Sequence, residues 1–292
     1  MLTYTHCTLC PRRCGVDRTA GQRGFCRMGD TPRAARAAVH YWEEPAIAGS
    51  YGAGAVFFSG CTLGCTYCQN QPISHGGFGR DLSPARLREI FLQLIDEGVQ
   101  SIDLVTPTHF LPSILPALTP KLPVPVVYNC GGYESVETLR QLEGLIDVYL
   151  PDYKYSDPGL AARLSQAPDY PEVAEAALRE MVRQTGPVRM EEDMLTRGVL
   201  VRHLILPGQI DNSLGVIDAL DRLFRPGEIL FSLMAQYTPM PGMTGGLARP
   251  ITREEYDAVL SYLWLSGIRD GYTQDFQSAS AEYIPSWDLA GL

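Results

Sequence analysis

The sequence predicts an α/β fold, namely a partial TIM-like (β/α)6 barrel preceded by a cysteine-rich N-terminal cap. Six short apolar segments alternate with helical segments along the chain, as expected for parallel βαβ units. An open doubly wound sheet would show the same alternation. However, polar and cysteine residues recur directly after the expected strands, and in α/β barrels that rim carries the active site. We therefore favour the partial barrel.

The first expected strand covers residues 55–60 (AVFFSG), which are rich in Val and Phe and end at a glycine. A helix is expected over residues 82–98, where Ser83 suits the N-cap, Pro84 the first turn and Gly98 the end. Its apolar face consists of Leu87, Ile90, Phe91, Leu94 and Ile95.

The alternation continues to the end of the chain. Further strands are expected over residues 101–106, 124–129, 146–152, 198–206 and 228–234. The expected helices are a short one interrupted by Pro116, one from about Ser135, and three over residues 172–186, 213–224 and 252–267. Because the first fifty residues lie outside this alternation, we divide the chain into a cysteine-rich cap (1–50) and a barrel (51–292).

Composition excludes several classes of protein. The formal net charge is −9, which argues against a nucleic-acid-binding surface. No apolar run approaches the length that spans a bilayer, and the N-terminus MLTYTHCTLC lacks the pattern of a signal peptide. We therefore expect a cytoplasmic protein that does not bind membranes. In a reducing compartment, clustered cysteines are more often metal ligands or catalytic groups than disulfides.

Three of the eight cysteines, Cys61, Cys65 and Cys68, follow the first expected strand in a C-x3-C-x2-C pattern. A closed metal site needs four ligands, whereas an iron–sulfur cube held by three cysteinates keeps one iron open. Gly60 and Gly64 allow such a loop to fold tightly. The alternatives are a zinc site completed by a distant residue, or three unrelated thiols.

Four more cysteines, Cys7, Cys10, Cys14 and Cys26, lie in the cap. Four thiolates are the full complement of a closed zinc site or of a second iron–sulfur cluster. The C-x2-C-x3-C start and the proline after the second cysteine favour iron–sulfur slightly, and the sequence leaves both metals open. Cys130 stands alone, and we interpret it as a buried thiol.

The cysteine motif of residues 61–68, with Tyr67 before its third cysteine and a glycine-bounded strand before its first, resembles the radical S-adenosylmethionine (SAM) superfamily. Within it the pattern is similar to the activating enzymes of pyruvate formate-lyase and other glycyl radical enzymes, and looks closest to an uncharacterised branch related to them. The resemblance covers roughly residues 51–240 and implies a [4Fe-4S] cluster whose open iron chelates SAM. An electron would then cleave SAM to methionine and a 5′-deoxyadenosyl radical, which abstracts hydrogen from the substrate.

The resemblance also implies cofactor contacts at the strand ends. The sequence PDYK matches the D-x-K of the activating enzymes, so Asp152 and Lys154 are expected at the methionine end of SAM. A surface salt bridge is the alternative for this pair. Asn129, in YNCGGY, is expected to hydrogen-bond the amino group or ribose, unless it only forms a turn.

The segment VTPTHF stands where many members of the superfamily carry a Gly-Gly-Glu motif, which is absent here. Thr106, Thr108 or His109 would then substitute for it. The other histidines outside the strand ends show no comparable context; they are His6, His40 and His75.

The last two strands supply further candidates. Arg202 and His203 alternate along the fifth strand, so at most one of them faces inward, and a satisfied buried histidine is the favoured interpretation of His203. Gln236 or Tyr237, in MAQYTP after the sixth strand, is expected near the adenine or ribose.

Together these features predict a radical SAM oxidoreductase, similar to the glycyl-radical activating enzymes, that abstracts hydrogen from a polypeptide. The resemblance further implies a flavodoxin- or ferredoxin-type reductant. An incomplete barrel would leave a lateral opening able to admit a polypeptide loop. The alternatives are radical modification of a small molecule or peptide, or a non-enzymatic zinc or iron–sulfur protein that binds a partner or transfers electrons.

Overall fold

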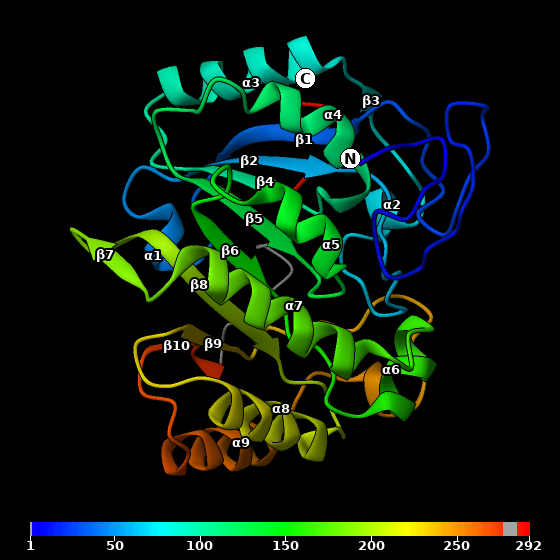
Figure 1. Ribbon diagram of the computed structural model, residues 1–292. Helices are drawn as coiled ribbons and strands as arrows, with labels where there is room; N and C mark the ends of the chain where they lie inside the picture. The colour runs from blue at the N-terminus through cyan, green and yellow to red at the C-terminus, as the bar shows by residue number, and fades with distance from the viewer. Residues whose placement is uncertain (1, 277–284) are drawn as a thin grey trace.

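The computed structural model describes residues 2–276 and 285–292, and within them a ten-stranded sheet organises the fold. Its centre is a run of parallel strands that are neighbours in the order in which they follow along the chain. They are β2 (Ala53–Phe58), β4 (Ile102–Val105), β5 (Val126–Cys130), β6 (Val148–Pro151), β8 (Met194–Leu204) and β9 (Leu230–Met234). All six strands predicted from the sequence are present, and the partial barrel is confirmed (Figure 1).

Helices cover the outer face of this curved sheet (Figure 1). The predicted cap at Ser83 is confirmed, since its hydroxyl accepts a hydrogen bond from the Arg86 N–H at 3.1 Å. The helices are α1 (Pro45–Ala48), α2 (Gln71–Ser74), α3 (Pro84–Asp96), α4 (Leu111–Ala117), α5 (Val136–Leu139), α6 (Pro158–Ser165), α7 (Tyr170–Thr185), α8 (Ile210–Leu223) and α9 (Arg253–Leu265). Among the described residues, none of these helices is long and apolar enough to cross a membrane.

The sheet also contains strands that the sequence did not predict. They are β1 (Arg33–His40), β3 (Arg80–Asp81), β7 (Arg189–Glu191) and β10 (Gly271–Thr273). β1 pairs with β2 in antiparallel orientation, although its sequence RAARAAVH is mostly Ala and Arg, residues of low or modest β-propensity. Part of the segment assigned to the cap therefore belongs to the sheet, and the division into two domains stays a prediction.

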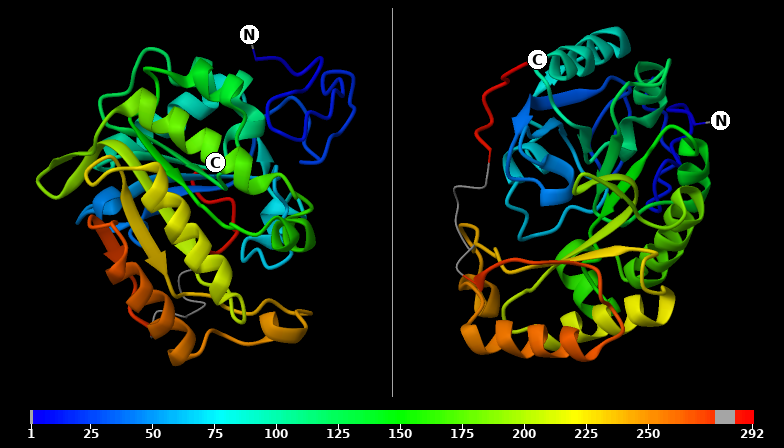
Figure 2. Two further views of the ribbon diagram at one scale, coloured as in Figure 1. Left: turned by 60° about the horizontal axis from the view of Figure 1, so that its bottom comes forward. Right: turned by 90° about the vertical axis from the view of Figure 1, so that its left-hand side faces the viewer.

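The sheet does not close into a full barrel. Its edges are β10 on one side and β1 with β3 on the other, and Figure 2 (right) shows these edges on opposite sides of the open face. The short helix α1 covers the end of the barrel where the parallel strands begin, because Ala46 and Ile47 pack among Val127, Val148 and Leu200. The interior therefore extends from α1 to the loops at the carboxyl ends of the strands.

The carboxyl group of Glu134, a residue in the loop after β5, is buried. It accepts hydrogen bonds from the Thr108 hydroxyl at 2.9 Å and from the Tyr128 hydroxyl at 3.1 Å. Burial nevertheless raises the pKa of Glu134 from 4.5 to about 7. A group whose pKa is higher in the folded state stabilises the protein fully below its unfolded pKa. That contribution is therefore lost as the pH rises from about 4.5 to about 7.

We expect Glu134→Gln to stabilise the protein at high pH, because the neutral amide avoids a buried charge. The gain in free energy of unfolding should be roughly 3 kcal/mol at pH 8 and shrink below about 1 kcal/mol at pH 5, since one pKa unit corresponds to about 1.4 kcal/mol. Urea unfolding at both pH values measures it, with Glu97→Gln at an exposed helix end as control. An equal effect at both pH values would show that burial does not raise this pKa.

Candidate functional site

The loop after β2 carries Cys61, Cys65 and Cys68, and its two glycines are required by the backbone. Gly60 has φ +81° and Gly64 has φ +66°, values that L-residues rarely adopt. A Cβ on Gly60 would lie 2.4 Å from Met28 Cγ, and one on Gly64 would lie 3.1 Å from the Phe25 ring. The prediction that these glycines let the loop fold tightly is confirmed, and the N-terminal segment packs directly against them.

The three thiols of this loop line one cavity of about 250 Å³. Each sulfur accepts a hydrogen bond; the donors are Leu63 N–H to Cys61 (3.4 Å), the Ser165 hydroxyl to Cys65 (3.0 Å) and the Ser74 hydroxyl to Cys68 (3.3 Å). Burial raises the pKa of Cys61 to about 12 and also raises that of Cys68. Cys61 and Cys68 therefore remain protonated unless a metal displaces the protons, and the hydrogen-bond donors at the three sulfurs suit thiolates.

The chemistry of this cavity fits an iron–sulfur cluster. Its lining contains the three thiols of the loop, the buried thiol of Cys130, and Asp152, whose carboxylate is already paired with Lys154 and Arg202. Soft thiolates without accompanying imidazole or free carboxylate ligands favour iron–sulfur centres or zinc. A cluster held by the three loop cysteines alone would keep one position open, and this stays a prediction.

The N-terminal segment, residues 2–32, contains no helix or strand and lies beside α2 (dark blue in Figure 1). Arg12 fastens it to the cysteine loop by donating to the Thr62 carbonyl at 3.0 Å and to the Leu63 carbonyl at 3.2 Å. The same guanidinium donates to the Ser165 carbonyl at 2.7 Å. One cap arginine thus holds together the cap, the cysteine loop and α6.

The cap cysteines lie close enough to affect one another electrostatically. Burial raises the pKa of Cys26, and Cys7 and Cys14 raise it further. Across the described residues (2–276 and 285–292), however, no group of three or more His, Cys, Asp or Glu side chains is arranged to hold a metal ion. The metal site on Cys7, Cys10, Cys14 and Cys26 and the cluster on Cys61, Cys65 and Cys68 therefore stay predictions. Cys130 is 3% exposed, so the predicted buried thiol is confirmed.

Asp152 and Lys154 follow β6 and line the same cavity as the thiols. Lys154 Nζ lies 2.5 Å from Asp152 Oδ2, and the two side chains are 22% and 21% exposed. This is an internal ion pair and not one on the surface. Although burial opposes both charges, Arg202 and Lys154 hold the pKa of Asp152 below its usual value, and Asp152 holds that of Lys154 above its own. Both groups are therefore charged at neutral pH.

Asn129 ends up inside a closed polar network and is not a turn residue. It lies in β5, where its Nδ2 donates to Glu43 Oε2 at 3.0 Å and to Asp103 Oδ2 at 3.2 Å. Its Oδ1 accepts from Arg202 at 2.7 Å. Arg202 also donates to Glu43 Oε1 at 2.8 Å and to Asp152 Oδ1 at 2.9 Å. The guanidinium thus joins three strands and the segment before α1.

Of the three candidates in VTPTHF, the structure brings Thr106 to the thiol cavity. Its φ of +59° is unusual for a β-branched residue, and such strain often marks functional sites. The Thr108 side chain instead bonds Glu134, and His109 Nε2 lies 2.7 Å from the Ser59 carbonyl oxygen. Burial lowers the pKa of His109 to about 3. His109 is therefore a neutral packing residue behind the cysteine loop.

On β8, Arg202 faces the interior and His203 faces the helices. His203 is fully buried, with Nδ1 2.7 Å from the Tyr153 carbonyl oxygen and Nε2 2.9 Å from the Ser213 hydroxyl. The prediction of a satisfied buried histidine is confirmed.

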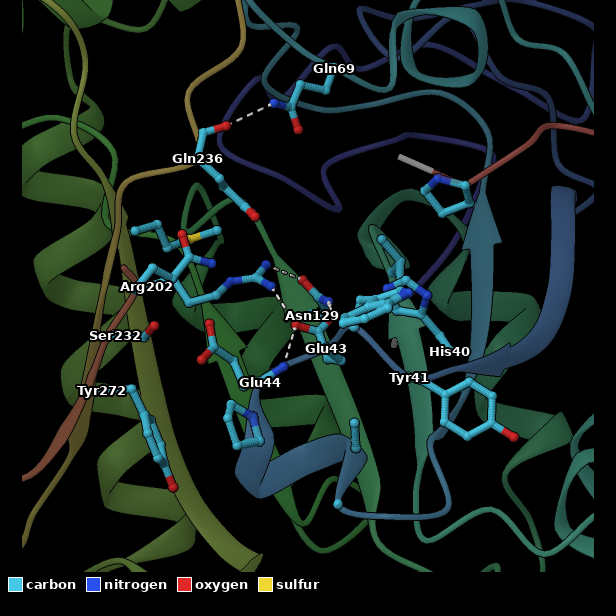
Figure 3. A pocket seen from close by; sticks show the side chains of 18 of the residues that line it. His40, Tyr41, Glu43, Glu44, Gln69, Asn129, Arg202, Ser232, Gln236 and Tyr272 are labelled. Carbon is cyan, nitrogen blue, oxygen red and sulfur yellow. Dashed lines mark hydrogen bonds and ion pairs between the residues drawn. The ribbon is translucent and has the colours of Figure 1, made fainter. Parts of the chain in front are cut away.

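After β9, the structure distinguishes Gln236 from Tyr237. Gln236 lines the thiol cavity, and its backbone carbonyl accepts a hydrogen bond from Gln69 Nε2 at 3.3 Å (Figure 3). Tyr237 is buried, and its hydroxyl donates to the Leu247 carbonyl at 2.7 Å. Gln236 is therefore the candidate that faces the cavity.

A second and larger cavity, of about 750 Å³, adjoins the thiol cavity, and Asn129, Arg202 and Gln236 line both. It opens between the segment that precedes α1 and strands β9 and β10 (Figure 3). Sequence reasoning missed several polar residues in and around it; they are His40, Glu43, Glu44 and Asp103. A signal existed for Asp103, a charged residue between Ile102 and Leu104 in an otherwise apolar strand. Residues 40–44 lie outside the predicted alternation of strands and helices, so no sequence pattern predicted that they would lie near the barrel.

The fold and these cavities define a partial α/β barrel whose carboxyl-end loops gather three thiols beside a buried lysine–aspartate–arginine group. No family model matches the chain. The chain is 30% identical over 218 residues to the uncharacterized protein MJ0674 of Methanocaldococcus jannaschii, a match that covers 71% of this chain and 59% of that protein. The chain thus spans less than two thirds of the curated relative it matches.

Solved structures with a similar fold include longer chains. Streptococcus suis SuiB matches with a TM-score of 0.51 and 14% identity, covering 76% of this chain and 49% of SuiB. Native anSMEcpe with bound AdoMet (SAM) matches with a TM-score of 0.52 and 12% identity, covering 73% of this chain and 61% of that chain. SuiB has also been solved with S-adenosylmethionine and with its precursor peptide SuiA. At this level of identity the likeness establishes the shared fold.

Proposed function

We propose that the protein is a radical SAM enzyme and that it abstracts hydrogen from a polypeptide, in the manner of the glycyl-radical activating enzymes. The observation that supports this most is the thiol cavity, where Cys61, Cys65 and Cys68 share one lining with Asp152 and Lys154. A zinc-binding or electron-transfer protein would need the thiols but not this internal ion pair. Two solved structures that share the fold contain bound SAM, which adds support.

In this proposal Cys61, Cys65 and Cys68 would hold a [4Fe-4S] cluster, and Asn129 and Arg202 would contact SAM. When bound, the cluster would supply the electron for reductive cleavage of SAM to methionine and the adenosyl radical that takes a hydrogen atom from the substrate. A flavodoxin- or ferredoxin-type protein is the proposed source of that electron.

The residues of the chain bind and orient SAM and exclude water from the site. Lys154 offers a compact cation to the carboxylate of SAM, and Asp152 orients the ammonium group of Lys154 from 2.5 Å. Arg202 fixes Asp152 from the other side at 2.9 Å. Because the pair is mostly buried, its interactions are screened by water less than those of a surface pair. No general base is needed when the substrate loses a hydrogen atom.

The test is anaerobic reconstitution with iron and sulfide, followed by reaction with SAM and dithionite. We expect 5′-deoxyadenosine and methionine to form in equal amounts, and a reduced flavodoxin to replace dithionite. Adding a candidate partner polypeptide, such as a glycyl radical enzyme encoded beside this protein, should raise the rate and leave a protein radical visible by electron paramagnetic resonance. A reconstituted cluster that never cleaves SAM would contradict the proposal.

A further inference from the structure

The larger cavity has the position of a substrate site next to the thiol cavity. Its volume is about 750 Å³, and it is continuous with the thiol cavity through Asn129, Arg202 and Gln236. It lies between β10 and the segment before α1 (Figure 3), the two sides of the barrel between which the sheet does not close. A molecule entering from this side would reach the space beside the three thiols.

The wall of this cavity carries a carboxyl group that lacks a cation. Glu44 is 8% exposed, lines the cavity, and forms no ion pair with any residue that the structure describes. Burial raises the pKa of Glu44 to about 7, although Arg202 opposes this rise. The hydroxyl of the adjacent Ser232 is fully buried and forms no hydrogen bond of regular geometry. It is nevertheless close enough to Glu44 to lower the pKa of that carboxyl group. The Glu44 carboxyl group thus lies beside the Ser232 hydroxyl on one side of the cavity and is paired with no cation (Figure 3).

The nearby cation, Arg202, is already occupied by other groups. Arg202 uses its three nitrogen atoms on Asp152, Glu43 and Asn129. His40 also lines the cavity, but burial lowers its pKa, so it is neutral at pH 7. Because a buried carboxylate without a cation is costly, a positively charged ligand would be favoured here over a neutral or anionic one.

Aromatic side chains at the same cavity agree with this charge preference. Tyr41 and Trp42 line it and are 59% and 67% exposed, and Tyr272 lies on the opposite side. The faces of aromatic rings attract ammonium and guanidinium groups within about 6 Å. A cation could therefore pass the aromatic residues at the opening and reach the carboxyl group within.

We propose that this cavity binds the substrate through a positively charged amino group, with Glu44 and Ser232 as its acceptors and Tyr41, Trp42 and Tyr272 around it. The proposal rests on the proposed function for the reaction itself, and it adds the chemical class of the substrate. The amino group belongs either to a lysine side chain of a polypeptide or to a free small amine. Both have the same chemistry at Glu44 and differ in what occupies the rest of the cavity.

The experiment measures binding to the reconstituted protein by calorimetry, with SAM omitted. The probes are n-butylamine, N-butylacetamide, the capped tripeptide acetyl-Gly-Lys-Gly-amide, and the same tripeptide with norleucine in place of lysine. We expect each amine to bind at least tenfold more tightly than its uncharged counterpart. Tighter binding of the lysine tripeptide than of butylamine identifies a polypeptide substrate, and the reverse identifies a small amine.

Glu44→Gln removes the charge and keeps the shape, so it should reduce amine affinity about tenfold or more and leave the norleucine tripeptide unaffected. Glu97→Gln, an exposed residue at the end of α3, is the control and should change nothing. Equal affinity for charged and uncharged probes, no amine binding at all, or unchanged amine affinity in Glu44→Gln would each overturn the proposal. The SAM-dependent spectral change and 5′-deoxyadenosine formation, measured separately, report on the proposed function and not on Glu44.

Discussion

Replacing Cys61, Cys65 or Cys68 singly with alanine is expected to abolish the [4Fe-4S] centre of the loop and all formation of 5′-deoxyadenosine. The three thiols line one cavity, whose lining also contains the paired Asp152 and the buried thiol of Cys130, which lies outside the cysteine loop. Each single variant keeps only two of the three loop thiols. Reconstituted wild type should show an iron–sulfur spectrum that changes when SAM is added. Each variant should lose that change and its SAM cleavage should fall to background.

The triple variant lacking these cysteines separates the loop from the cap. Metal analysis of this variant should still find iron or zinc on Cys7, Cys10, Cys14 and Cys26, and the metal found decides whether the cap can exchange electrons, since zinc has no redox chemistry. A triple variant that still responds spectroscopically to SAM would show that the cluster has been assigned to the wrong cysteines. A triple variant free of metal would instead remove the cap site.

Lys154→Ala is expected to weaken SAM binding on the order of tenfold to a hundredfold. In the proposed complex Lys154 gives the carboxylate of SAM a charge-assisted hydrogen bond in a mostly buried pocket, and losing such a bond costs about 1.5–3 kcal/mol. Iron content and the SAM-free spectrum should stay normal, because no cysteine is changed. Titration of the spectral change with SAM, together with 5′-deoxyadenosine formation, measures the effect.

The matched control is Lys121→Ala, which changes the other lysine of the chain. Lys121 pairs with Asp147 and is 54% exposed, so its loss should leave SAM affinity unchanged. Lys154→Arg should restore binding only in part, because a planar guanidinium does not occupy the position of an ammonium group. Wild-type affinity and turnover in Lys154→Ala would remove Lys154 from the cofactor site.

Local patterns were enough to predict the framework of the molecule. The six parallel strands, the cap at Ser83 and the tight loop around Gly60 and Gly64 follow from residues within a few positions of one another. The spacing of apolar residues between turn residues determines locally whether a strand or a helix forms. Glycine tolerates a left-handed backbone in any surroundings. The recurrence of polar residues after strands also predicted where the cavity would lie.

The side chains of the segment VTPTHF point in different directions, which the sequence alone could not predict. Thr106 reaches the cavity, whereas Thr108 and His109 turn into the packing behind it. The positive φ of Thr106 redirects the chain at this point, so simple alternation of side chains fails. On β8, alternation holds, and it left open only whether Arg202 or His203 faces inward.

Tertiary structure alone decided which distant residues complete the site. Glu43 and Glu44 precede α1, nearly 160 positions before Arg202, yet Glu43 pairs with Arg202 at 2.8 Å. The cause is β1: its antiparallel pairing with β2 brings the segment that follows it into the barrel interior. A strand of Ala and Arg carries little pattern of its own, because its stability comes from the partner strand. The sequence by itself determined the six strands and the thiol loop. The pairing of β1 with β2, a tertiary contact, determined which charged residues are buried inside the barrel.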